Sequence, residues 1–240
     1  MRLKIKLVPL LAFLFLSTNL IGQDKKVALV SFYTDKKIGG TVMGKSASLM
    51  KDPNFNLKPF LEKAYDKFVN DFAKDFPFKL MDKSEVVNNE EYKKYESVFL
   101  MDTTKFLNNQ YAIIDGFVFA YPCSPCFIKG ENRDECKLAN MFSAADGVMF
   151  VSLDYEMDSR MQGFSSGVTA YITITLYDKK CEKVFRVREA GSSTKKVPAV
   201  GGVPIMKSEK ILPMCEEATD KLFKDLEGKL GKIIKKSAKF

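Results

Sequence analysis

Residues 145–192 constrain the fold more than any other part of the sequence. Residues 168–177 alternate between apolar side chains and threonine or tyrosine, the two-residue period of a strand with one buried face. A shorter apolar run, 147–155, precedes them, and β-type residues resume over 183–189 after a polar segment, 178–181, of hairpin-loop length. These three runs predict an antiparallel meander.

The first half of the chain predicts a strand, a long helix and a second strand. Residues 26–33 are apolar and rich in β-branched and aromatic types, and residues 34–53 read as a long loop. A helix follows. Asn56 as a cap and Pro59 in the first turn indicate its start, and Pro77 ends it. Its apolar residues recur at three- and four-residue spacing, at Phe60, Leu61, Ala64, Tyr65, Phe68, Phe72 and Phe76.

The remaining segments are expected as follows. Residues 78–81 form a strand, 84–95 a weaker helix and 111–121 a strand, while 101–110 are ambiguous. Residues 122–142 form a cysteine-containing excursion from the sheet, and 191–204 a mobile Gly/Ser/Pro-rich loop. A C-terminal helix over 213–235 carries one apolar stripe and is weakened near its end by Gly228 and Gly231.

Together these elements predict an α/β (α+β) fold in one domain, residues 23–240. The expected architecture is a mixed sheet of about five strands with an antiparallel C-terminal meander. A long helix from the N-terminal half and the C-terminal helix pack on it. A chain of 240 residues that is 46% hydrophobic has ample material for such a core.

The first 22 residues have the pattern of a signal peptide. Arg2, Lys4 and Lys6 precede an apolar run, 7–16, and residues 17–22 are mostly small or polar. The apolar run is short for a membrane span, so we expect cleavage near Gly22 and an exported protein, periplasmic or extracellular. Leu20 is larger than the residue a signal peptidase prefers, which keeps an uncleaved anchor as the alternative.

The chain is basic, and the excess is strongest near the C-terminus. Removing the three basic leader residues takes the formal charge from +8 to +5. The C-terminal cluster consists of Lys229, Lys232, Lys235, Lys236 and Lys239. We interpret it as a solvated helix end favoured by the helix dipole, with contact to a membrane surface as the alternative. Nucleic acid is a poor partner outside the cytoplasm.

Residues 39–46, GGTVMGKS, match the phosphate-loop pattern G-x-x-x-x-G-K-S at Gly39, Gly44, Lys45 and Ser46. In a true phosphate loop the backbone amides surround phosphate oxygens and the lysine reaches their charge. Here five residues separate the motif from the preceding strand, and Pro53 interrupts any following helix. The context therefore argues against nucleotide binding, and no cofactor is expected. Nucleotide binding that is lost in Lys45→Ala would reverse this interpretation.

The five cysteines include a C-x-P-C sequence, Cys123 to Cys126, followed by Cys136. This spacing suggests thiol redox chemistry, but the residues after Cys126 are loop-like rather than helical. In an oxidising compartment a structural disulfide is favoured, from Cys136 to Cys123 or Cys126. Insulin reduction that is lost in Cys123→Ser would instead establish an oxidoreductase. A zinc site is not expected, because the chain has no histidine.

The absence of histidine also removes the commonest general base and every Ser-His or Cys-His arrangement. Carboxylates remain, and Asp154, Glu156 and Asp158 alternate along one strand end. They could bind a cation or act as an acid–base pair, but we interpret them as a polar sheet margin. No catalytic residue is assigned.

The element order, together with residues 26–30, 145–151 and 172–178, is similar to the small α/β domains of Gram-negative envelope proteins. These are the curli-secretion-channel, penicillin-binding-protein-activator and TolB N-terminal group. The chain departs from them in lacking a lipoprotein cysteine and in carrying the 122–142 excursion. The resemblance implies a non-catalytic binding or assembly module whose partners are other envelope proteins, and it transfers no site residue.

Overall fold

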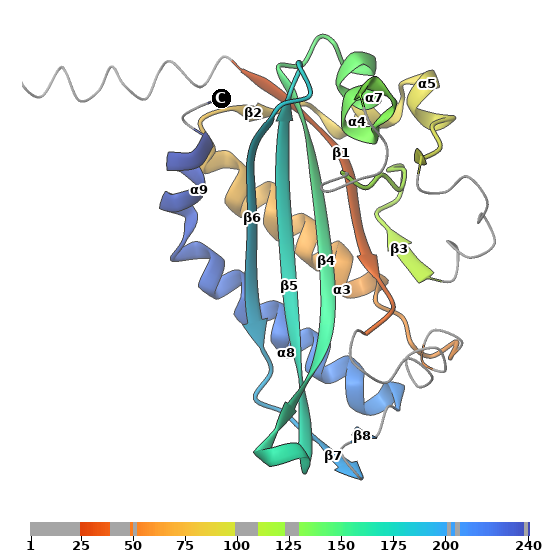
Figure 1. Ribbon diagram of the computed structural model, residues 1–240, viewed down its shortest axis with the longest axis vertical. Helices are drawn as coiled ribbons and strands as arrows, with labels where there is room; N and C mark the ends of the chain where they lie inside the picture. Colours follow the sequence, from red (N-terminus) through yellow and green to blue (C-terminus); the bar gives the residue numbers. More distant parts are fainter. Residues whose placement is uncertain are drawn as a thin grey trace, which may run out of the picture.

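The computed structural model describes residues 25–38, 49, 52–98, 110–122, 130–200, 203–204, 207–237 and 240. Its centre is a mixed sheet in which β1 runs parallel to β2 and β4, while β4, β5 and β6 form the antiparallel meander (Figure 1). The predicted α/β class and meander are therefore confirmed. The strands are β1 Lys26–Asp35, β2 Lys79–Leu80, β3 Tyr111–Ile113, β4 Gly147–Arg160, β5 Ser165–Asp178, β6 Lys183–Ser192, β7 Val197–Val200 and β8 Val203–Pro204.

The alternation in β5 decides which face of the sheet is apolar, although side chains on both faces of β5 are largely buried. Val168, Ala170, Ile172, Ile174 and Leu176 have no exposed surface. Tyr155 of β4 lies opposite Ala170, and its hydroxyl hydrogen-bonds Thr219 Oγ1 at 2.8 Å. Thr219 belongs to α8, Ser208–Glu227, so the apolar face is the one that meets the helices. The other face carries the threonines and tyrosines.

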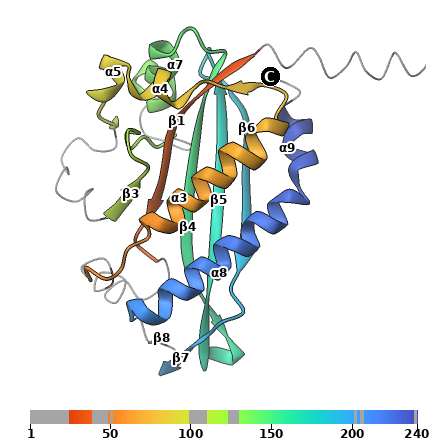
Figure 2. The same ribbon diagram turned by 180° about the vertical axis from the view of Figure 1, so that it is seen from behind.

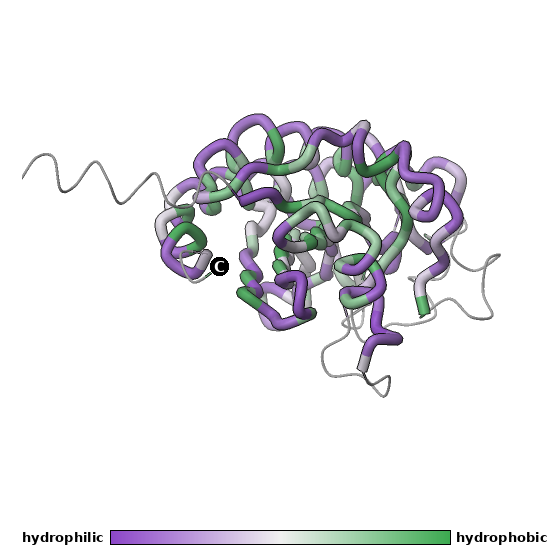
Figure 3. Tube along the Cα trace, turned by 90° about the horizontal axis from the view of Figure 1, so that it is seen from above, coloured by the Kyte–Doolittle hydropathy of each residue, from purple (hydrophilic) through white to green (hydrophobic). Residues whose placement is uncertain are grey.

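Two helices cover the apolar face, α8 and α3, Lys58–Lys67, as the view from behind shows (Figure 2). The proline predicted in the first turn of α3 is confirmed, but the predicted cap is wrong, because Leu57 is the N-cap and makes no side-chain capping bond. Asn56, one residue earlier, accepts a hydrogen bond at Oδ1 from Lys58 N at 3.0 Å. The helix continues as a π-helical turn, Phe68–Phe72, and a 3-10 turn, Ala73–Asp75, and ends before Pro77. Seen from above, hydrophobic positions concentrate between the helices and the curled sheet (Figure 3).

The C-terminal helix differs from its prediction at the start. It begins at Ser208 rather than Pro213, so Pro213 lies inside the helix, where its missing N–H removes one intrahelical hydrogen bond without ending the helix. The sequence predicted a weakened helix at Gly228, and the helix ends there. After it the chain forms a separate helix, α9, Leu230–Ser237. No described helix is long and apolar enough to cross a membrane.

The predicted strand over 111–121 is mostly wrong. Of this segment only Tyr111–Ile113, strand β3, is a strand, and it pairs with β1. A turn with Gly116 at φ 87° follows it. Beyond the turn, side chains replace the strand ladder, because Val118 N donates to Tyr92 Oη at 3.1 Å and Ala120 N to Ser31 Oγ at 3.2 Å. These substitutes satisfy the backbone without a partner strand.

Three further segments depart in detail from expectation. The weak helix expected over 84–95 is two short helices, α4 Lys83–Val87 and α5 Glu90–Lys93, separated at Asn89, which caps α5. The segment expected as a loop over 191–204 contains the end of β6 and the strands β7 and β8. The 122–142 excursion contains a helix, α7, Asp134–Met141, whose Leu138 and Ala139 are buried.

Candidate functional site

A basic groove lies between α9 and the edge strand β6. Its volume is about 530 Å³. Among the described residues β6 pairs only with β5, and α9 packs along its other side. The residues that line the groove are Val184, Phe185, Arg186, Lys232, Lys235 and Lys236. Strand and helix thus bring together residues far apart in the sequence.

The periodicity of α9 places its lysines in this groove. Ile233 is fully buried against the core, and Leu230 packs on it. Lys232, Lys235 and Lys236 follow at three- and four-residue spacing, which puts them on one face of the helix. The lysines therefore line a concave surface, and all three are exposed, in keeping with a solvated helix end.

The groove carries uncompensated positive charge. Among the described residues no acidic side chain lines the groove, and none of its four cations forms an ion pair. Lys229 differs, because its Nζ pairs with Glu189 on β6 and so helps to hold the helices to the sheet. Lys239 lies outside the described residues. A concave site with four cations and two apolar side chains suits an anionic group attached to an apolar one.

A second polar cluster surrounds Cys136, which lies in α7. Cys181 lies in the β5–β6 hairpin loop. Arg133 donates from Nη2 to Cys136 Sγ at 3.4 Å, and its Nη1 lies 3.2 Å from the buried carboxylate of Glu135. Burial, reinforced by the neighbouring Cys136 thiol, raises the pKa of Cys181 to about 12.

Neither Cys181 nor Cys215 is poised for nucleophilic chemistry. Cys215 is fully buried in α8, and its burial raises the pKa of the thiol well above its usual value. Cys136 is present as a free, buried thiol. Cys123 and Cys126 lie outside the described residues, so the bridge expected between one of them and Cys136 stays a prediction.

The three alternating carboxylates lie on the open face of β4. Glu156 pairs with Arg188 at 3.0 Å, and Asp158 pairs with Arg160 at 2.8 Å. Asp154 is half-buried, and its burial raises the pKa of the carboxyl to about 6 although Ser152 donates a hydrogen bond to it at 3.0 Å. Within the described ranges no group of three cysteines or carboxylates is placed to hold a metal ion.

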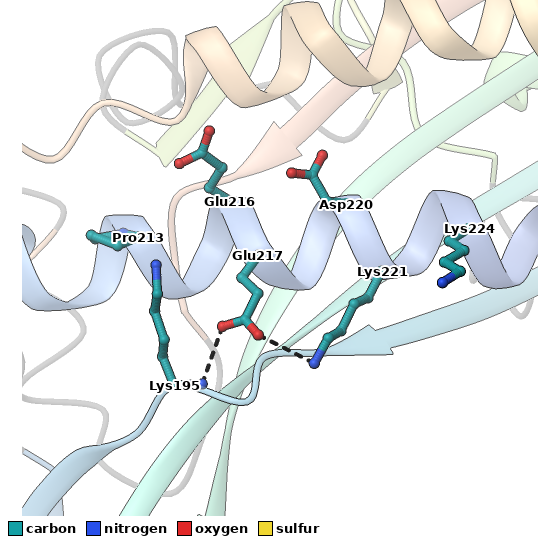
Figure 4. A pocket seen from close by; sticks show the side chains of 7 residues that line it. All are labelled: Lys195, Pro213, Glu216, Glu217, Asp220, Lys221 and Lys224. Carbon is teal, nitrogen blue, oxygen red and sulfur yellow. Dashed lines mark hydrogen bonds and ion pairs between the residues drawn. The ribbon is translucent and has the colours of Figure 1, made fainter.

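A hollow of about 360 Å³ lies where α8 meets the segment after β6 (Figure 4). Glu217 points from α8 into it and accepts hydrogen bonds from the backbone amides of Thr194, at 2.9 Å, and Lys195, at 3.1 Å. The Thr194 contacts lower the pKa of Glu217 to about 2, and Lys221 Nζ lies 3.2 Å away. Of the acidic residues around this hollow, Glu217 fastens the segment after β6, whereas Glu216 and Asp220 pair with Lys63 of α3.

The phosphate-loop residues Gly39, Gly44, Lys45 and Ser46 lie outside the described residues, and that interpretation stays untested. The sequence alone did not reveal that Arg186 lies at the groove, because the lysines that line the groove with it are remote in the chain. The lysine spacing in α9 was the only signal that pointed toward the groove.

Comparison with known proteins identifies no family. No family model and no curated protein matches the chain. A hypothetical protein from Chlamydia trachomatis aligns with 9% identity and a TM-score of 0.40, over 86% of this chain and 95% of the other. A neuraminyllactose-binding hemagglutinin homolog from Helicobacter pylori aligns with 11% identity and a TM-score of 0.38, over 90% and 91%. Similarity at this level supports no conclusion about function.

Proposed function

We propose that this protein is an exported, non-catalytic binding module of the cell envelope, and that it contacts an anionic membrane surface through the groove between α9 and β6. The observation that carries the proposal is the set of four unpaired cations around Val184 and Phe185. The leader-like residues 1–22 and the absence of histidine from the chain support it.

A lipid surface fits the groove because the groove offers cations for the anionic headgroups and an apolar surface for the acyl chains. Lysines near an anionic bilayer each contribute about 1 kcal/mol, so three lysines and an arginine give a useful but reversible attraction. Val184, which is partly exposed at the same place, suits the boundary between headgroups and acyl chains, while Phe185 is buried in the core beneath it. The resemblance to envelope domains agrees with this setting, and partner proteins of the envelope would be recruited by other surfaces.

The test is sedimentation of the purified protein with vesicles of phosphatidylcholine alone or mixed with phosphatidylglycerol. We expect binding only to the anionic vesicles, and a loss of more than about 10-fold in the triple variant Lys232→Glu, Lys235→Glu, Lys236→Glu. A matched control reverses the exposed Lys74, Lys94 and Lys180, which changes the net charge equally but leaves the groove intact.

Equal losses in both triple variants would show that net charge alone drives binding and would refute the groove. Equal binding to neutral vesicles would refute an anionic ligand. If the protein binds neither kind of vesicle but binds an acidic polypeptide through the same lysines, the groove is a binding site and its partner is a protein, which refutes the membrane proposal.

A further inference from the structure

The tip of the β4–β5 hairpin exposes two large apolar side chains. Among the described residues only three large hydrophobic side chains are exposed, and two of them, Met161 at 65% and Phe164 at 73%, lie in this turn. The hairpin tip and α9 lie toward opposite ends of the long axis of the molecule (Figure 1). Apolar side chains gathered on a protruding surface mark a place where a protein or a membrane makes contact.

The backbone of this turn is held in an unfavourable conformation. Met161 and Gln162 have φ values of 49° and 54°, in the left-handed region where glycine or asparagine is usual. Phe164 N donates to Met161 O at 3.1 Å, and Ala199 N of β7 donates to Phe164 O at 3.0 Å, so the turn is fixed in this shape. A turn that served only to reverse the chain would favour glycine or asparagine at these positions. Strain that coincides with exposed apolar side chains therefore indicates a role for those side chains.

Arg160 braces the hairpin directly below the tip. It lies opposite Ser165 in the ladder, where its Nε donates to Asp158 Oδ2 at 2.8 Å and its Nη1 donates to Ser193 O. Gly167 makes room for the guanidinium, because a Cβ there would lie 2.1 Å from Arg160 Cζ. The tip is thus held on a fixed support, so little conformational entropy is lost when it makes contact.

The charge around the tip selects an anionic partner. Residues 159–167 form the tip and residues 192–200 pass beside it, and neither segment contains aspartate or glutamate. Lys195 and Lys196 are exposed there, and within the described ranges neither side chain forms an ion pair. Lysines beside exposed apolar side chains are the combination that binds the interface of an anionic bilayer.

The area of the tip favours a bilayer over a protein. Two side chains of this size bury at most about 400 Å². A stable protein interface takes roughly 800 Å² from each partner. A bilayer needs no matching pocket, because its acyl chains rearrange around whatever enters. A small convex tip with cations at its base therefore suits lipid.

We propose that the tip of the β4–β5 hairpin inserts Met161 and Phe164 into the interface of an anionic bilayer, with Lys195 and Lys196 at the headgroups. This contact does not depend on the groove between α9 and β6. Phe185 of the groove pairs with Leu176, near one end of β5, whereas the tip adjoins the other end. The two places are about 35 Å apart along the strand.

The experiment uses tryptophan fluorescence. The chain has no tryptophan, so Phe164→Trp places a single fluorophore at the tip. With vesicles that mix phosphatidylcholine and phosphatidylglycerol we expect its emission to move to shorter wavelength and to be quenched by brominated acyl chains. Phosphatidylcholine alone should change it little, because the lysines then gain no attraction. Tyr121→Trp, at the third exposed hydrophobic side chain, is the matched control and should not shift.

Both tryptophan variants are repeated with Lys232→Glu, Lys235→Glu and Lys236→Glu, which separates a failure of the groove from a failure of the tip. The shift of Phe164→Trp should persist there at saturating lipid. In the same background, replacing Met161 and Phe164 by serine should lower the affinity for anionic vesicles at least about 10-fold. Both side chains are exposed, so this variant should keep its melting temperature.

Three results would overturn the proposal. The first is a tip tryptophan whose emission stays that of an indole in water when anionic vesicles are present. The second is a shift that disappears when the groove lysines are reversed, because the tip would then have no lipid contact of its own. The third is a shift that appears without vesicles as the protein concentration rises, because a second copy would then cover the tip.

Discussion

Asp154 shows how one residue on the open sheet face makes stability depend on pH. Burial holds its pKa at about 6, and the nearby Asp35 adds to the effect. Because the folded state favours the protonated carboxyl, the free energy of unfolding falls by up to about 3 kcal/mol as the pH rises from about 4 to about 6. We expect Asp154→Asn to raise the melting temperature at about pH 7.5 and to change little at about pH 4, as measured by calorimetry.

Glu156→Gln is the matched control on the same strand face. Glu156 is well exposed and pairs with Arg188, so its loss should destabilise the protein at neutral pH by less than about 1 kcal/mol. The two variants therefore have opposite signs at neutral pH. A neutral-pH loss of stability in Asp154→Asn would contradict the origin assigned to its raised pKa.

The left-handed backbone at residue 181 makes a second prediction at this scale. With reductant present, Cys181→Gly should be more stable than Cys181→Ser by about 1 kcal/mol, because serine keeps the strain that glycine relieves. Urea unfolding of the two variants measures the difference. Equal stabilities would mean that the loop relaxes without cost.

At the scale of elements, Gly→Ala substitutions at two positions distinguish the effect of close packing from the effect of helix propensity. A Cβ on Gly191 of β6 would lie 2.2 Å from Leu222 N, in the backbone of α8. Gly191→Ala must therefore push α8 off the sheet, and we expect a loss of about 2–4 kcal/mol. A Cβ on Gly231 of α9 meets nothing within 4 Å, so Gly231→Ala should stabilise by roughly 0.5 kcal/mol.

Urea unfolding with a shared analysis of both variants checks this pair. The contrast is informative because the chemical change is the same at each position. If Gly191→Ala were as well tolerated as Gly231→Ala, the close approach of β6 to α8 would be wrong.

The sequence predicted those elements whose pattern is local. The alternation in β5 and the prolines at 59 and 77 need no knowledge of the rest of the fold. The start of α8 was missed, because Pro213 is a helix breaker only where its lost hydrogen bond matters. The segment after Ile113 was misassigned, because strand composition does not reveal that Tyr92 and Ser31 would satisfy its amides.

At the scale of the whole molecule, the candidate site depends on long-range contacts. Periodicity indicated that α9 is amphipathic, but nothing local indicated that Arg186 of β6 would line the same groove as its lysines. Segment pairing of this kind follows from the sheet order, which the alternation of apolar residues does not specify.

The position of the groove at one edge of the sheet makes a final prediction about the intact protein. The groove borders β6 and α9, whereas β4 and β5 lie inside the sheet and are covered by α3 and α8. Docking through the groove should therefore slow hydrogen exchange in α9 and around Val184 and Phe185, and leave the amides of β5 unchanged. Hydrogen–deuterium exchange with anionic vesicles measures this footprint, and neutral vesicles are the control.

Raised salt should remove the protection, because it screens the lysines. A footprint over the Glu217 hollow instead, or protection spread evenly across the sheet, would show that the charge of this groove does not set the orientation of the molecule.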